Sequence, residues 1–147
     1  MIDGQASLVI TSETYTAADV TRALGIQPDL SAEKGDLRPR NNGGSEPIRR
    51  RHYETSVWAL EVDSTPATMM AVDEDASKGF ATLHVLVDRL LGRGEMLSQI
   101  RQYYAVSLNW YGTAAEGQTT AILPAGLIRD VAELGLDLVV TLYPREA

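Results

Sequence analysis

The sequence predicts an α+β protein: a two-layer sandwich with a mostly antiparallel sheet of about five strands and helices on one face. Segments that alternate apolar and polar residues, as half-buried strands do, are separated by segments whose apolar residues recur every three or four positions, as in amphipathic helices. Alternation on the strands implies one buried face, which is typical of antiparallel sheets. The length of 147 residues predicts a single domain spanning residues 1–147.

The N-terminal part predicts a strand followed by a helix. Residues 7–11 are short, β-branched and bounded by polar residues, which suits a strand. Thr16 fits a helix N-cap, and Gly25 fits the position just after a helix, where a positive φ is common. Val20 and Leu24 supply the apolar stripe that such a helix buries.

Two stronger elements follow in the middle of the chain. Residues 53–62 predict a strand with one buried face, made of Trp58, Leu60 and Val62. Residues 64–79 contain Pro66 and an acidic group, and favour irregular structure. The longest predicted helix comes next, because apolar residues recur at helical spacing from Phe80 to Leu91.

The C-terminal part predicts a short helix, two strands, a helix and a final strand. Val106, Leu108 and Trp110 alternate as on a strand, and residues 119–123 read as the strand that returns beside it. Pro124 suits the first turn of a helix. The order β-α-β-α-β-β-α-β, with one additional short helix, allows a ferredoxin-like arrangement.

Positive charge is concentrated in a long basic loop at residues 27–52. The chain has a net charge of −7, yet six of its thirteen Lys and Arg residues lie between positions 33 and 52: Lys34, Arg38, Arg40, Arg49, Arg50 and Arg51. The segment has no apolar periodicity, and connections of this length in compact domains are usually functional or disordered. The loop is therefore the best candidate for a binding surface.

Eight residues in and near this loop are the candidate binding residues. Arginines can grip a phosphate or a carboxylate through paired hydrogen bonds, and aromatic rings beside them can stack on a planar ligand. The alternatives are that Asp36 caps a turn and pairs with a nearby cation, that the arginines are a solvated edge, and that Trp58 is core. The candidates are Lys34, Asp36, Arg38, Arg40, Arg49, Arg51, Trp58 and Tyr111.

Several short motifs in their order along the chain resemble a known family. These are the helix and its Leu-Gly-Ile-Gln-Pro ending at residues 16–28, Lys-Gly-Asp at 34–36, the strand around Trp58, and the closing helix, Leu-Gly and strand up to Tyr143. Together they resemble the bacterial family called domain of unknown function 4279. The resemblance implies a small α+β protein without an established activity, and it transfers no catalytic residues. The basic loop is longer and more basic than the family pattern suggests.

Many chemistries lack their residues in this sequence. There is no cysteine, which excludes disulfides and thiolate chemistry and fits a cytoplasmic protein. No signal peptide or membrane-spanning run is visible. His84 and Asp88 lie four residues apart, but a metal site needs three or four ligands. The sequence predicts no catalytic residues, no cofactor and no metal.

These observations favour a non-enzymatic protein-interaction module, of immunity or regulatory type, that binds an acidic partner through the loop. The alternative is a protein that binds a small anionic or nucleotide-like ligand between the loop and Trp58 or Tyr111. An enzyme with Asp36 or Glu61 as a base ranks third, because no spacing singles these residues out. Nucleic acid ranks last among the expected partners, since the rest of the chain is acidic.

Overall fold

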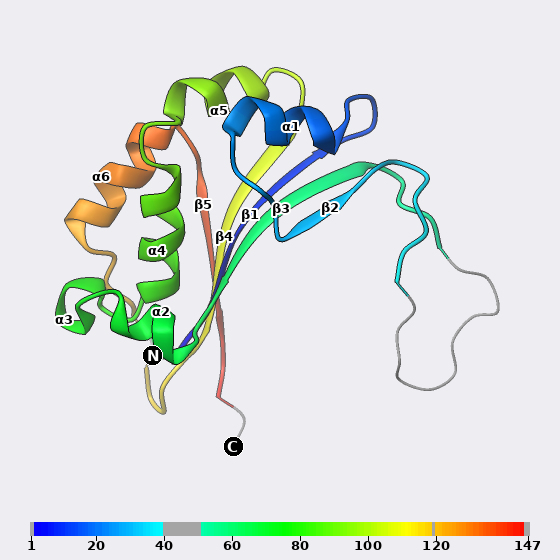
Figure 1. Cartoon of the computed structure of the whole chain (residues 1–147). Coiled ribbons are helices and arrows are strands. Elements are labelled where there is room, and N and C mark those ends of the chain that lie inside the picture. The colour runs from blue at the N-terminus through cyan, green and yellow to red at the C-terminus, as the bar shows by residue number, and fades with distance from the viewer. Residues whose placement is uncertain (1, 40–50, 119, 146–147) are drawn as a thin grey trace.

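The computed structural model describes residues 2–39, 51–118 and 120–145. Within them the strands are β1 (Ile2–Ser12), β2 (Leu30–Ala32), β3 (Ser56–Asp63), β4 (Ala105–Thr113) and β5 (Leu138–Tyr143). The helices are α1 (Ala17–Leu24), α2 (Pro66–Met70), α3 (Glu74–Ser77), α4 (Ala81–Leu90), α5 (Gly94–Ile100) and α6 (Ala125–Leu134). The helices pack on one side of the sheet (Figure 1), which confirms the predicted two-layer α+β fold.

The five strands form one sheet in the order β2-β3-β1-β4-β5. All neighbouring strands are antiparallel except β4 and β5, which are parallel. Helix α6 connects these two adjacent strands, so β4-α6-β5 is a direct βαβ unit. A ferredoxin-like fold instead places a third strand between the strands that a helix connects. The mostly antiparallel sheet is confirmed, but the connection at its β5 end differs from that arrangement.

Helix α1 forms where its caps and apolar stripe predict it. The Thr16 side chain accepts a hydrogen bond of 3.2 Å from the backbone N–H of Asp19, and Gly25 ends the helix with a φ of 68°. Val20 and Leu24 are buried. The helix thereby covers β3, where the Trp58 indole N–H donates to the Thr21 hydroxyl at 3.0 Å.

The core lies between the helices and one face of the sheet. The predicted alternation on β3 is confirmed, because the side chains that point into this core include Trp58, Leu60 and Val62. Helix α4 covers β1 and β3 and buries Leu83, Leu86 and Leu90 completely. Each of these leucines contributes about 2 kcal/mol by leaving water.

A buried carboxylate joins the sheet to α4. Asp3 on β1 is only 6% exposed and accepts hydrogen bonds from the backbone N–H of Thr82 (2.9 Å), the Thr82 hydroxyl (2.6 Å) and the Trp110 indole (2.8 Å). Thr82 lies in the first turn of α4, where backbone N–H groups have no partner within the helix. Asp3 therefore caps α4 from the neighbouring layer and fixes the Trp110 ring.

Three sequence predictions need correction. Residues 120–123 are irregular, and Thr119 lies outside the described residues, so the returning strand predicted at 119–123 is wrong. Strand β4 is already flanked by β1 and β5, which leaves no position for another strand. The short strand β2 lies inside the predicted loop, and residues 64–79 contain the short helices α2 and α3. A three-residue strand and one-turn helices carry too little periodicity to be recognised.

Candidate functional site

The basic loop leaves the sheet as two short antiparallel arms, residues 35–38 and 51–53. The Arg38 N–H donates to the Arg51 carbonyl at 2.8 Å, and the Tyr53 N–H donates to the Asp36 carbonyl at 2.8 Å. Leu37 and His52 form a β-bridge between the arms. The arms continue beyond β2 and β3, away from the helices (Figure 1). Their pairing brings Arg38 and Arg51 side by side, although thirteen positions separate them in sequence.

A tight turn forms the start of the first arm. The Asp36 carboxylate accepts a hydrogen bond of 2.7 Å from the Glu33 N–H, and the Asp36 N–H donates to the Glu33 carbonyl at 3.0 Å. Gly35 takes a φ of 91°, a conformation that favours glycine. The Lys34 ammonium group donates to the Glu13 carbonyl at 3.3 Å. Asp36 thus caps the turn, and within the described residues it forms no ion pair with Lys34.

Beside the arms lies an open hollow of about 820 Å³, here called the basic hollow. Its lining includes the cationic residues Arg38 and Arg51, together with His52 and the acidic residue Glu54. Its apolar side is formed by Leu30 of β2 and Val57 of β3, which lie on the sheet face opposite to Trp58. Pockets that bind ligands have volumes of roughly 300–1,000 Å³, so the hollow has room for a side chain or a small molecule.

The arginines of the basic hollow have no carboxylate partner among the residues that the structure describes. There the only ion pair joins Asp19 to Arg22, on α1. The Arg38 guanidinium instead lies 5.2 Å from the centre of the Tyr53 ring, a cation–π contact. Both arginines are exposed, so their charges are available to a ligand.

His52 also lines the hollow. Its Nδ1 lies 2.8 Å from the Gly35 carbonyl oxygen. A carbonyl only accepts hydrogen bonds, so this contact places the proton on Nδ1 and leaves Nε2 for other partners. The imidazole can therefore add a hydrogen bond to whatever the arginines attract.

The structure does not bring all eight predicted binding residues together. Arg38 and Arg51 line the basic hollow, whereas Lys34 and Asp36 belong to the turn. Arg40 and Arg49 lie outside the described residues.

The two aromatic candidates lie apart from the hollow. Trp58 is fully buried on the helix side of β3, so its ring is core and forms no wall of the hollow. Tyr111 points to the open face of the sheet. Its neighbour on β1 is Gln5, and the neighbour of Gln5 on β3 is Asp63. Asp63 is the last residue of β3 and is distant from Val57, so Tyr111 does not reach the hollow. There it stacks on Tyr143, with 6.4 Å between ring centres.

Leu30, Tyr53 and Val57 line the hollow but are not among the predicted binding residues. A signal for Val57 existed, because a residue next to Trp58 on a strand must face the opposite side of the sheet. Tyr53 directly precedes the strand and follows the arginines, but its ring contact with Arg38 depends on the pairing of the arms.

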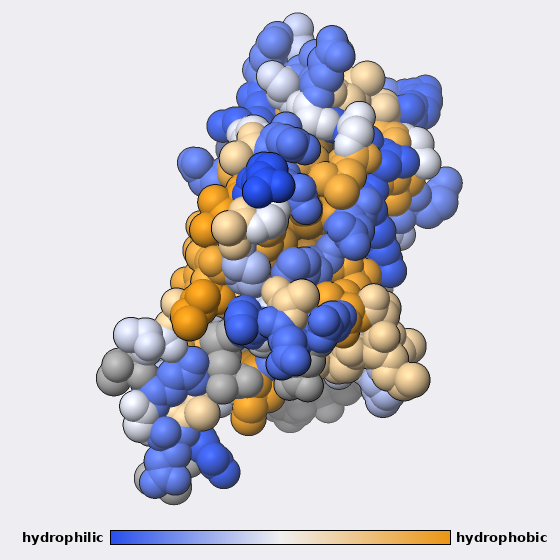
Figure 2. Space-filling model, turned by 90° about the vertical axis from the view of Figure 1, so that its left-hand side faces the viewer, coloured by the Kyte–Doolittle hydropathy of each residue, from blue (hydrophilic) through white to orange (hydrophobic). Residues whose placement is uncertain are grey.

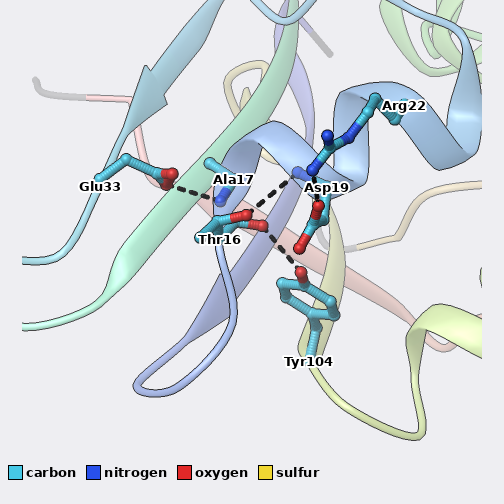
Figure 3. A network of polar contacts seen from close by, with 6 residues as sticks. All are labelled: Thr16, Ala17, Asp19, Arg22, Glu33 and Tyr104. Carbon is cyan, nitrogen blue, oxygen red and sulfur yellow. Dashed lines mark hydrogen bonds and ion pairs between the residues drawn. The ribbon is translucent and has the colours of Figure 1, made fainter.

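A polar network holds the turn against α1 (Figure 3). The Glu33 carboxylate accepts a hydrogen bond of 2.6 Å from the Ala17 N–H at the start of the helix. On the other side, the Tyr104 hydroxyl donates to the Thr16 carbonyl at 2.7 Å. A carboxylate at a helix N-terminus satisfies a free N–H and interacts well with the helix dipole. The first arm is thus anchored to the helical layer.

Two pKa shifts accompany this network. The hydrogen bond from Arg22, helped by that from Thr16, lowers the pKa of the exposed Asp19 carboxyl. Burial raises the pKa of the Tyr104 hydroxyl, and the negative charges of Asp19 and Glu33 raise it further. Tyr104 therefore stays neutral and keeps its donor hydrogen well into the alkaline range.

Two negative findings concern the described part of the chain. No group of three or more His, Asp or Glu side chains there is arranged to hold a metal ion. No helix among the described residues combines the length and the apolar character that crossing a membrane requires.

The fold and the hollow define an α+β protein with a helix-covered core and a cationic recess at one edge of its sheet. A comparison with protein families shows to which family the chain belongs. It belongs to the family described as Domain of unknown function (DUF4279), whose family model matches residues 3–145. Neither the comparison with curated proteins nor that with solved structures finds a match.

Proposed function

We propose that this protein is a non-enzymatic binding module that recognises an acidic segment of a partner protein through the basic hollow. The observation that carries the proposal is the pair Arg38 and Arg51, held side by side by the arms and without a carboxylate partner among the described residues. Two adjacent guanidinium groups can hold a carboxylate by paired, charge-assisted hydrogen bonds.

The shape of the hollow supports a protein partner. Sites for small molecules enclose most of the ligand surface, whereas this hollow is open and its cationic residues are exposed. Apolar residues adjoin the charges in the lining of the hollow: Leu30 is 37% exposed, and Val57 lies beside it. An acidic segment that carries one apolar side chain would satisfy both parts of this surface.

The rest of the molecule supports the same proposal. The net charge of −7 makes the basic hollow a local exception, so an acidic partner would be guided to this edge. The proposal includes a cytoplasmic location in a bacterium, which the absence of cysteine fits.

The test is affinity capture from a lysate of the source organism with the full chain and with Arg38→Glu/Arg51→Glu. We expect a captured partner to be lost from this variant, and the loss to be mimicked by raised salt. The matched control is Arg89→Glu/Arg129→Glu, which changes the net charge equally at two exposed residues outside the hollow. If both variants capture the same proteins as the native chain, the proposal is wrong.

A small anionic ligand is the second candidate, and the volume of the hollow favours it. A space of about 820 Å³ accommodates a phosphorylated metabolite, whose planar part could lie on the apolar side near Val57. A thermal-shift screen with phosphorylated metabolites should then raise the melting temperature in proportion to the logarithm of ligand concentration. The native chain should respond and Arg38→Glu/Arg51→Glu should not; a flat response across the screen would exclude this candidate.

A further inference from the structure

The opposite edge of the sheet, strand β5, has no strand partner on its outer side within the described residues. Its six residues, Leu-Val-Val-Thr-Leu-Tyr, include no charge and no proline. Val139, Val140 and Tyr143 are 50%, 39% and 54% exposed. Natural proteins usually protect such an edge with charges, bulges or prolines, because its free N–H and C=O groups pair readily with another strand.

The hydrogen bonds of β5 show which of its backbone groups are free. The Tyr143 carbonyl accepts a hydrogen bond of 2.8 Å from the Ala114 N–H, so the peptide groups of this residue point toward β4. Backbone groups alternate sides along a strand. The N–H and C=O groups of Leu138, Val140 and Leu142 therefore point outward.

We propose that β5 pairs with β5 of a second copy of this chain, antiparallel and about a two-fold axis at Thr141. In this register Val140 of each copy lies opposite Leu142 of the other, so the outward N–H and C=O groups of these two residues meet. Leu138 lies opposite Pro144, which has no N–H, so only the Leu138 N–H can form a hydrogen bond there. A two-fold axis makes the contact self-complementary, which is the commonest arrangement of homodimers.

Charge complementarity selects this register among those that the backbone allows. Asp137 precedes β5 and Arg145 follows it, and both side chains are exposed. Only an axis at Thr141 places Asp137 of one copy opposite Arg145 of the other, and symmetry repeats this pair at the far end. A register shift of one residue, which moves the axis to a point between two residues, would set outward backbone groups against groups already bonded to β4.

The same register also covers the most exposed side chains of β5. Val139 and Tyr143 both point to the open face of the sheet, since their neighbours on β4 are Asn109 and Thr113. With the axis at Thr141, Val139 of each copy lies opposite Tyr143 of the other, in a pair without mutual hydrogen bonds, where side chains come closest. Aromatic and β-branched residues are favourable cross-strand partners.

Apolar surface on the helix side adjoins this edge. Val140 is 39% exposed although it points toward the helical layer, and Ile128 of α6 is 52% exposed. Figure 2 shows hydrophobic atoms, in orange, reaching the surface of the helix side. Pairing of two six-residue strands buries a small area by itself, so we expect a dimer that dissociates on dilution.

The test is sedimentation equilibrium of the full chain over a wide range of concentrations. We expect the native protein to approach twice its chain mass of 16.0 kDa as concentration rises. Asp137→Arg and Arg145→Asp, each of which sets like charges opposite one another, should weaken the dimer at least tenfold. The double variant Asp137→Arg/Arg145→Asp exchanges the charges and should restore the native dissociation constant.

Controls distinguish the effect of the proposed register from the general effect of a charge change. Asp88→Arg makes the same charge change at an exposed position of α4 and should leave dimerisation unaltered. Thermal melting of each variant confirms that it is folded. A native chain that stays monomeric at all concentrations would overturn the proposal. So would single variants that dimerise normally, or a double variant that fails to restore the dimer.

Discussion

The two edges of the sheet are built in opposite ways. At one edge, β2 has three residues, and beyond it the Asp29 carboxylate accepts the N–H of Glu61 at 2.8 Å. The Asp29 side chain thus occupies a backbone group of β3 that a longer β2 would have covered. At the other edge, β5 has six uncharged residues and a free outer side within the described residues.

This difference is the basis for the two kinds of recognition proposed above. The short β2 offers few backbone groups for strand pairing, so we expect a partner there to be recognised through side chains, chiefly Arg38 and Arg51 in the basic hollow. The β5 edge has almost no charge of its own and offers backbone groups, so it suits another strand. In the two proposals, the first edge selects a partner by charge and the second by register.

The largest expected effect comes from a change that damages both edges together. Asp3→Ala removes the acceptor for three buried donors, so we expect the free energy of unfolding to fall by about 3 kcal/mol. Chemical denaturation measures this free energy of unfolding. The matched control is Asp63→Ala, which removes an exposed hydrogen bond from Gln5 and should cost less than about 1 kcal/mol. Equal losses would mean that the buried network does not support the sheet.

A smaller change should affect the β2 edge of the sheet and leave the β5 edge unaffected. Glu33→Gln weakens the cap that joins the first arm to α1, and we expect a loss of about 1 kcal/mol. Hydrogen exchange should accelerate at residues 17–19 and 35–38, because the turn loses its anchor. Exchange in β5 should remain unchanged; acceleration there as well would contradict the independence of the edges.

The smallest effect depends on pH. Tyr104→Phe removes the hydrogen bond to the Thr16 carbonyl and should cost about 1 kcal/mol or less at pH 7. The folded pKa of Tyr104 is raised above its ordinary value of 10.0, so the native chain keeps this contribution below pH 10 and loses it as the pH rises through the folded pKa.

The native chain and this variant should therefore converge in stability above pH 10, as measured by urea unfolding. Tyr103→Phe is the control, because Tyr103 is 57% exposed and its ring contacts Tyr15. A difference that stays constant with pH would show that the hydroxyl contributes by packing alone.

Local signals in the sequence were sufficient for most of the fold. Thr16 and Gly25 mark the ends of α1, and the alternation around Trp58 marks the buried face of β3. Local signals could not predict which distant segments pair with one another. The run at residues 119–123 has the composition of a strand, but β4 has no free side for it. The parallel pairing of β5 leaves no trace in its own residues.

The candidate site was predictable to the same extent. The concentration of arginines identifies the segment, because charge is a property of composition. That Arg38 meets Arg51 depends on the pairing of the two arms, which no local pattern contains. Trp58 was proposed as a wall of the site, yet its position on the strand directs it into the core.

Mapping an acidic probe on the full chain by two-dimensional NMR tests the central claim most directly. The probe is the peptide Glu-Glu-Phe-Glu-Glu, with Lys-Lys-Phe-Lys-Lys as its control. We expect the acidic peptide to shift the amide signals of residues 30, 37–38 and 51–57, to leave β5 unshifted, and to lose these effects in Arg38→Glu/Arg51→Glu. Shifts that are absent around Tyr53 and Val57, or that the basic peptide reproduces, would contradict the assignment of the basic hollow as a site for acidic partners.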